Sequence, residues 1–177
     1  NPSVAAALIR PHIGSMDVLS LTPRGRWRPL SAGEAGLCAE IFGAGIDPGR
    51  VRLFAQPLVW PGRAFVAGPT LVVWPWRAAL ADFAAEGVGL AAQAMFVHEM
   101  THVWQAQNGV NLLAAKLRAG DGPGAYAYDL GTGCAFADLN IEQQAMVVEH
   151  AFIASRGGPA PHDETTYAAV SAGWRRA

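Results

Sequence analysis

Two histidines and a glutamate stand at a spacing that suits a metal-dependent hydrolase. They occur in the run His98-Glu99-Met100-Thr101-His102. Residues four apart lie on one face of an α-helix, so both imidazoles can point at a single metal ion. Glu99 follows the first histidine directly, which places its carboxylate beside a metal-bound water. Zinc lowers the pKa of such a water to about 7. The run therefore predicts a zinc-dependent hydrolase in which Glu99 acts as the general base.

A third zinc ligand has to come from outside this run, because a catalytic zinc site usually takes three protein ligands and keeps one position for water. Glu142 is our first choice, since it lies near the start of a predicted helix and has the small Ala145 on the same face. Glu149 follows seven residues later on nearly the same face, and His150 is next to it. Both remain alternatives. Two further histidines rank below these three: His12 and His162.

Catalysis also needs groups that orient the ligands and groups that stabilise the oxyanion of the tetrahedral intermediate. The acids that could orient a ligand histidine are Asp129, Asp138 and Glu149. The side chains that could stabilise the oxyanion are Tyr126, Tyr128, His150 and His162. We take Tyr128 as the catalytic candidate of this group. The alternative is a tyrosine that packs in a loop with its hydroxyl satisfied, which is commoner in proteins generally.

The motif run falls in a segment with the pattern of a long helix, residues 90–108, which Gly109 ends. An earlier helix begins with the capping box from Ser31 to Glu34 and ends at Gly43. Three further helices are predicted after the motif, over residues 111–119, 138–155 and 163–175, with Asp138 or Asn140 as the cap of the second.

Short β-prone runs fill the segment between the first helix and the motif helix. They cover residues 51–54, 57–60, 64–66 and 70–74, with a further short run at 18–21 and a short helix or turn at 78–85. The order predicts an α+β fold: a small, mostly antiparallel sheet packed on the motif helix, with further helices C-terminal to it. An edge strand such as 70–74 could pair with an extended peptide, although its continuous apolar residues favour a core strand.

The composition suits one domain covering residues 1–177, with 51% hydrophobic and 15% charged residues. A net charge of −1 gives no reason to expect a nucleic-acid partner, and no apolar run is long enough to span a membrane. The first residue is Asn1 rather than Met, so a removed leader is possible and the localisation stays open between cytoplasm and export. Cys38 and Cys134 have no CxxC partner, which favours two buried thiols over a disulfide.

The run His98 to His102, taken with the downstream Glu142, resembles the zincin metallopeptidases and among them the gluzincins, in which a glutamate on a later helix is the third ligand. More narrowly, residues 98–105 and 140–145 resemble metallopeptidase domains found with bacterial Rhs and Vgr-type secretion proteins. The resemblance implies a zincin-like fold, Zn²⁺ as cofactor, a peptide or protein substrate, a bacterial source and a secretion-system partner. The chain departs from the gluzincin pattern at Met146, where an aspartate often orients a ligand histidine.

The leading expectation is a zinc metallopeptidase. A second hypothesis is a non-catalytic, zinc-stabilised interaction module of a secretion system, which would keep the motif and lack an open cleft. A third is a zinc amidase that acts on cell-wall peptides. The motif predicts the metal and the base, whereas the choice of substrate depends on the resemblance, because a zinc-activated water can hydrolyse several kinds of bond.

Overall fold

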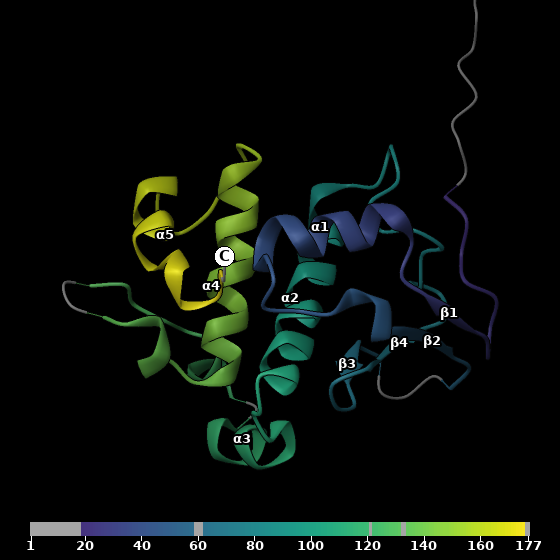
Figure 1. The fold of residues 1–177 in the computed structure, drawn as a ribbon, viewed down its shortest axis with the longest axis horizontal. Coiled ribbons are helices and arrows are strands. Elements are labelled where there is room, and N and C mark those ends of the chain that lie inside the picture. The colour runs from purple at the N-terminus through teal and green to yellow at the C-terminus, as the bar shows by residue number, and fades with distance from the viewer. Residues whose placement is uncertain (1–18, 59–61, 121, 132–133, 176–177) are drawn as a thin grey trace, which may run out of the picture.

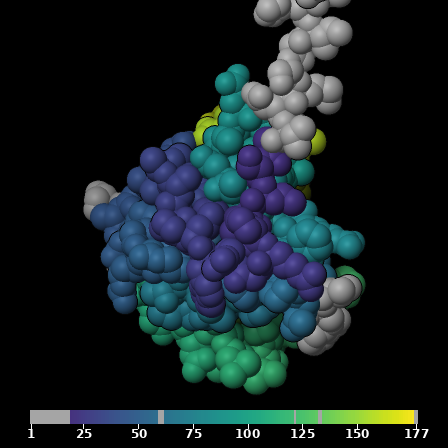
Figure 2. All heavy atoms as spheres, turned by 90° about the vertical axis from the view of Figure 1, so that its right-hand side faces the viewer, coloured from purple at the N-terminus to yellow at the C-terminus, as the bar shows by residue number. Residues whose placement is uncertain are grey.

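The computed structural model describes residues 19–58, 62–120, 122–131 and 134–175, which form an α+β fold with a four-stranded sheet on one side of a group of helices (Figure 1). The strands are β1 (Trp27–Pro29), β2 (Arg52–Gln56), β3 (Phe65–Val66) and β4 (Leu71–Pro75). The helices are α1 (Ala32–Phe42), α2 (Leu90–Gln107), α3 (Leu112–Ala119), α4 (Ile141–Ser155) and α5 (Glu164–Val170). The long helices α2 and α4 lie side by side, and α3 lies at the lower end of the molecule in Figure 1. Figure 2 shows the side of the molecule that the N-terminal half of the chain covers, with green segments that follow α2 in the sequence at the bottom.

The sheet has the strand order β1-β2-β4-β3 and is mixed rather than mostly antiparallel. The two outer pairings are antiparallel, but the central and longest one, β2 with β4, is parallel. The chain leaving β2 first forms β3 and then turns back, so β4 runs in the direction of β2 and lies between them. The run 70–74 is therefore a core strand, as its apolar residues indicated, and the two edge strands are β1 and β3.

The helix boundaries follow the predicted caps closely. The Ser31 hydroxyl accepts from the Glu34 amide at 3.0 Å, and the Glu34 carboxylate accepts from the Ser31 amide at 2.8 Å, so the capping box of α1 is present. Gly109 follows α2 with φ +90°, a conformation that favours glycine. Asn140 caps α4 by accepting from two backbone amides of its first turn. The alternative cap, Asp138, lies in a short 3-10 turn before it.

Three predicted segments differ from the structure. Of the run at 18–21, only an isolated bridge between Leu21 and Leu80 remains within the described residues, whereas residues 78–85 form turns, which is one of the two predicted alternatives. The last helix is shorter than predicted, because α5 ends at Val170 and passes into a 3-10 turn over Ser171–Gly173. Residues 57 and 58 are not in a strand, and residues 59 and 60 lie outside the described residues. Strand β1 was not predicted, since its Arg-Pro ending looks like a loop.

Helix α2 runs through the hydrophobic core, so the turns of α2 just before and just after the motif are largely buried. The core joins α1, the sheet, α2 and α4 through residues that include Phe42, Leu53, Val72, Phe96, Val97, Met100, Val103, Val147 and Val148. Trp74 and Trp104 belong to this core, which favours packing over a role in substrate binding. Cys38 is a buried thiol, whereas Cys134 is a thiol that is partly exposed. No helix in the described part of the chain is both long and apolar enough to span a membrane.

Candidate metal centre

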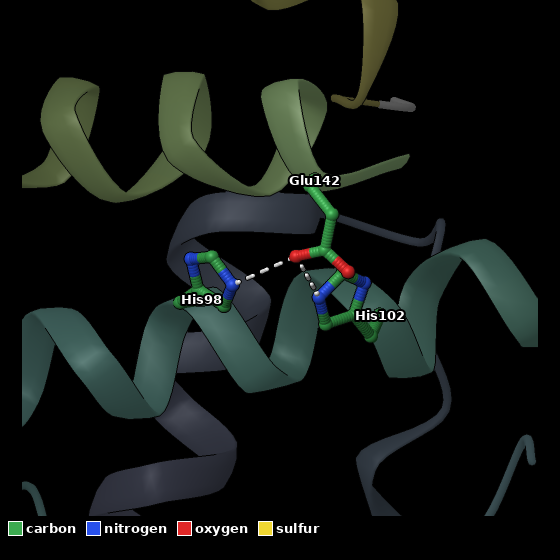
Figure 3. Close-up of side chains that lie close together, drawn as sticks. All are labelled: His98, His102 and Glu142. Atoms are coloured by element: carbon green, nitrogen blue, oxygen red, sulfur yellow. Dashed lines mark ion pairs between the residues drawn. The ribbon is translucent and has the colours of Figure 1, made fainter. Parts of the chain in front are cut away.

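His98, His102 and Glu142 converge at the contact between α2 and α4 (Figure 3). The two histidines lie on one face of α2, and Glu142 reaches them from the first turn of α4. Glu142 Oε2 is 3.7 Å from His98 Nε2 and 3.4 Å from His102 Nε2. All three side chains are buried. The structure thus brings together the two predicted motif ligands and our first choice for the third.

Each histidine has its other ring nitrogen occupied by an acceptor. His98 Nδ1 is 2.9 Å from Glu149 Oε2, and His102 Nδ1 is 2.8 Å from Gln105 Oε1. Because carboxylate and amide oxygens only accept, each Nδ1 carries the proton, and the neutral imidazole then has its lone pair on Nε2. Both lone pairs therefore face the space that Glu142 Oε2 also faces.

The orientation of Gln105 is set by its own partners. Its Nε2 donates to the Ile141 carbonyl and to Gln144 Oε1, both at 2.9 Å, so its Oε1 has to face His102. Gln105 is completely buried. The role of Gln105 could not be predicted from the sequence, because a glutamine one turn after a motif histidine has no distinguishing feature apart from its i, i+3 spacing.

The other oxygen of Glu142 is held by a lysine from a third helix. Lys116 Nζ of α3 lies 2.7 Å from Glu142 Oε1 and donates to the Tyr126 hydroxyl at 3.0 Å. The ammonium group also lies 5.1 Å from the centre of the Tyr126 ring. Lys116 was likewise missed from the sequence, since 26 residues separate it from Glu142.

The electrostatics of the centre follow from burial and pairing. Burial alone would lower the pKa of His98, but hydrogen bonds to Glu142 and Glu149 outweigh it and raise the pKa to about 9. Burial would raise the pKa of Glu142, but its hydrogen bonds to both histidines and Lys116 hold that pKa well below the usual range.

The donor set fits zinc. Tetrahedral zinc with bonds of about 2.0 to 2.1 Å places neighbouring ligand atoms roughly 3.4 Å apart, and the two nitrogen-to-oxygen separations here are 3.4 and 3.7 Å. The three ligand atoms lie within 4.8 Å of one another. Two imidazoles and one carboxylate form a common ligand set of catalytic zinc. His98, His102 and Glu142 would hold the ion.

Glu99 is the buried acid of the motif that has no structural partner. Its side chain is 5% exposed, and its Oε2 is one of two buried side-chain polar atoms without a hydrogen bond in the described residues, the other being Trp104 Nε1. Burial raises the pKa of Glu99, although the positive charge on the motif histidines opposes that shift. A carboxylate with a raised pKa is a stronger base than an exposed one.

A cleft of about 990 Å³ opens over the motif, which is in the size range of a ligand site. Its walls are mostly apolar and include Phe65, Val66, Met95, Ala106, Val110, Leu112, Leu113, Ile141 and Met146. His98, Glu99, His102, Lys116, Tyr126, Glu142 and Glu149 contribute its polar groups, with Arg63 near one end. Edge strand β3 forms part of one wall.

The remaining candidates lie around this centre in different roles. Glu149, weighed as a ligand and as an orienting acid, contacts His98 from the far side of the ring. Of the other two acids, Asp129 is exposed, and Asp138 accepts from the Ala135 amide.

The tyrosines divide between the cleft and a neighbouring network. Tyr126 lines the cleft, whereas the Tyr128 hydroxyl is 2.7 Å from both His150 Nδ1 and the Tyr167 hydroxyl. His162 packs against the rings of Tyr128 and Tyr167. Tyr128 is therefore a half-buried residue with its hydroxyl bonded on two sides, and its role as an oxyanion group stays a prediction.

Comparison with known proteins relates the chain to a protein of a bacterial secretion system. No protein-family profile matches it. Over 136 residues, or 71% of the chain, it is 39% identical to the type VI secretion system spike protein VgrG2b of Pseudomonas aeruginosa, of whose length it spans 13%. The solved effector domain of Pseudomonas aeruginosa VgrG2b is 34% identical to it, with a TM-score of 0.64 and 84% of each chain covered. The chain belongs to the family of the VgrG2b effector domain, which links it to the Vgr proteins of bacterial secretion systems.

Proposed function

We propose that the chain is a zinc-dependent peptidase of the gluzincin type, with Glu99 as general base. The observation that carries the proposal is the pairing of a converged donor set, His98, His102 and Glu142, with a buried base that makes no structural hydrogen bond, both at the floor of one large cleft. A site built only for stability would satisfy its buried carboxylate. In this site, Glu99 Oε2 has no hydrogen-bond donor and can accept a proton.

The chemistry divides among the side chains of the centre. Zinc, when bound, supplies a Lewis acid that allows water to lose a proton near neutral pH. Glu99 accepts the proton of the attacking water and then passes it to the leaving nitrogen. Glu149 and Gln105 hold the two imidazoles with their Nε2 atoms toward the centre. The low exposure of the motif keeps bulk water from competing for Glu99.

Edge strand β3 supports an extended peptide as the substrate. Ala67 N donates to Leu71 O, so in the antiparallel pattern the intervening backbone of Val66 points away from β4. Val66 is one of the residues that line the cleft. A peptide added along β3 would run past the zinc ligands, which is the strand-addition mode considered above as an alternative for residues 70–74.

The family assignment gives the setting for this activity. VgrG2b is a secretion-system spike protein, and the related solved structure is its effector domain. We propose that this chain is likewise an effector, that it acts as an enzyme after a secretion apparatus delivers it, and that its target is a protein or peptide of the recipient cell.

A direct test compares hydrolysis by the wild type with hydrolysis by Glu99→Gln. The amide cannot take a proton from water, so we expect cleavage of denatured casein or a peptide library to fall by at least about 100-fold, with zinc still bound. Glu86→Gln, the same substitution at an exposed position, is the matched control and should keep wild-type activity.

Purified peptidoglycan, digested in parallel, separates the peptidase from the cell-wall amidase. Cleavage of peptidoglycan and of no protein would replace the proposal with the amidase. Zinc binding without hydrolysis of either substrate would favour the non-catalytic interaction module, although the open cleft supports an enzyme.

A further inference from the structure

Each of the three candidate ligands is held by one polar side chain, and the partner of Glu142 differs in kind from the other two. Glu149 and Gln105 occupy the Nδ1 atoms of the histidines, which cannot bind the same ion as Nε2. Lys116 instead occupies Oε1 of Glu142, an atom that could itself coordinate the ion together with Oε2. Its ammonium thus competes with the metal for a ligand atom.

We propose that Lys116 is a positioning residue that restricts Glu142 to binding metal through one oxygen, and so selects an ion of low coordination number at this centre. The inference rests on the proposed zinc site. It is carried by the division of the Glu142 carboxylate: Oε2 faces both histidines at 3.4 and 3.7 Å, while Oε1 lies 2.7 Å from Nζ.

The position of Lys116 is fixed from several sides. Its helix, α3, packs on both α2 and α4, and its Nζ is also bonded to the Tyr126 hydroxyl and lies over the Tyr126 ring. The Lys116 side chain is 30% exposed and the Glu142 side chain 5%. A charge-assisted bond to a nearly buried carboxylate is among the stronger hydrogen bonds in proteins. Oε1 is therefore not easily given up to a metal ion.

The consequence for metal selection follows from coordination chemistry. With Oε1 held, the protein supplies two nitrogens and one oxygen, which suits four-coordinate zinc with one position open. With Oε1 released, Glu142 could bind through both oxygens, and the site would gain the extra oxygen ligand that favours ions such as Mn²⁺. Loss of Lys116 should therefore move the preference of the site from zinc toward manganese.

The experiment measures the ratio of the Mn²⁺ and Zn²⁺ dissociation constants by chelator competition, in the wild type and in Lys116→Met. The ratio is used because both ions carry the same charge, so removal of a nearby positive charge affects both affinities alike. We expect the ratio to fall by roughly 10-fold or more in Lys116→Met. Lys116→Arg, which can still donate to Oε1, should stay near the wild type.

Visible absorption of the Co²⁺-loaded protein gives an independent reading of coordination number. Four-coordinate Co²⁺ absorbs several times more strongly than five- or six-coordinate Co²⁺, so the band should weaken in Lys116→Met and persist in Lys116→Arg. Arg118→Met removes the same charge from an exposed position of the same helix, and should change neither measurement. Lys116→Gln repeats both measurements with a polar side chain, which covers the case in which Lys116→Met does not fold.

The outcomes separate this inference from the proposed function. A wild type that binds no zinc contradicts the metal site itself. A wild type that binds zinc, with the same metal ratio and the same Co²⁺ band in both Lys116→Met and Lys116→Gln, overturns the role of Lys116 alone. A shift of equal size in Arg118→Met would also overturn it, because the effect would then come from net charge.

Discussion

Two buried glutamates, Glu34 and Glu99, have opposite surroundings. Glu34 is completely buried and accepts four hydrogen bonds: two from the Arg28 guanidinium at 2.6 and 2.7 Å, one from the Ser31 amide at 2.8 Å and one from the Phe83 amide at 2.9 Å. Both of its oxygens are satisfied. Glu99 is nearly as buried, yet its Oε2 has no partner at all.

The difference separates a carboxylate that stabilises the fold from one that is reserved for chemistry. The Glu34 carboxylate accepts hydrogen bonds from β1, from the start of α1 and from the turn before α2. Glu99 Oε2 makes no hydrogen bond to any other element of the described chain, and burial disfavours the charged form of Glu99. The same substitution, glutamate to glutamine, should therefore have opposite effects at the two positions.

The largest effect on stability is expected for Glu34→Gln. The amide leaves the Arg28 guanidinium, whose side chain is 15% exposed, without its counter-charge, and removal of one partner from a buried pair costs about 3–5 kcal/mol, which is an upper bound here. Urea unfolding of the metal-free protein measures this loss. Activity per folded molecule should remain near wild type, since Glu34 does not line the cleft. A loss below about 1 kcal/mol would contradict the structural role of the pair.

A smaller effect, on metal affinity, is expected for Glu149→Ala. The substitution removes the acceptor that fixes the His98 tautomer, and loss of such a partner typically weakens zinc binding about 10–100-fold. Glu40→Ala is the control, because it breaks an exposed ion pair between α1 and Arg156, the residue that follows α4. Chelator competition should find the Glu40→Ala affinity unchanged. Equal affinities in all three proteins would show that Glu149 does not orient His98.

A still smaller effect, on substrate binding, is expected for Val66→Pro. Proline removes the outward amide of β3 and leaves the bond from Ala67 to Leu71 in place. Loss of one backbone hydrogen bond to a peptide corresponds to a fall in kcat/KM of about 2- to 10-fold. Val66→Ala keeps the amide and should lose less. If the alanine variant loses as much as the proline variant, the peptide does not pair with β3.

The smallest effect, and one of opposite sign, is expected for the stability of Glu99→Gln. Folding raises the pKa of Glu99, so the folded state holds this proton more tightly than the unfolded chain does. The ionised Glu99 therefore costs stability as the pH rises above the ordinary glutamate pKa. At neutral pH the metal-free Glu99→Gln protein should unfold at higher urea concentration than the wild type. A lower midpoint would mean that Glu99 supports the fold as Glu34 does.

The parts of the site that the sequence predicted are those with local or periodic signals. His98 and His102 stand four apart in a helix that ends at a glycine, and Glu142 follows a recognisable cap at Asn140. The missed groups, Gln105 and Lys116, belong to the centre only through contacts between helices. A lone glutamine or lysine in a helix is usually a solvated residue, so no pattern sets these two apart.

The fold shows the same division between local and distant information. The capping box at Ser31 predicted α1 correctly, since its hydrogen bonds form within one turn. The parallel pairing of β2 with β4 was missed, because the runs of β-prone residues do not reveal which strand lies between which. The continuous apolar residues of 70–74 favoured a core strand correctly, but no pattern indicated that the two residues of β3 lie at an edge of the sheet.

The metal content of the purified protein is the most direct test of a zinc site formed by His98, His102 and Glu142. We expect about one zinc ion per chain in the wild type and in Glu99→Gln. The ion should be lost in His98→Ala and in His102→Ala, because three ligands are needed to hold it. Glu34→Gln, measured under conditions where it is folded, should keep its zinc. A wild type without bound zinc, or histidine variants that retain zinc in full, would contradict the proposed zinc site.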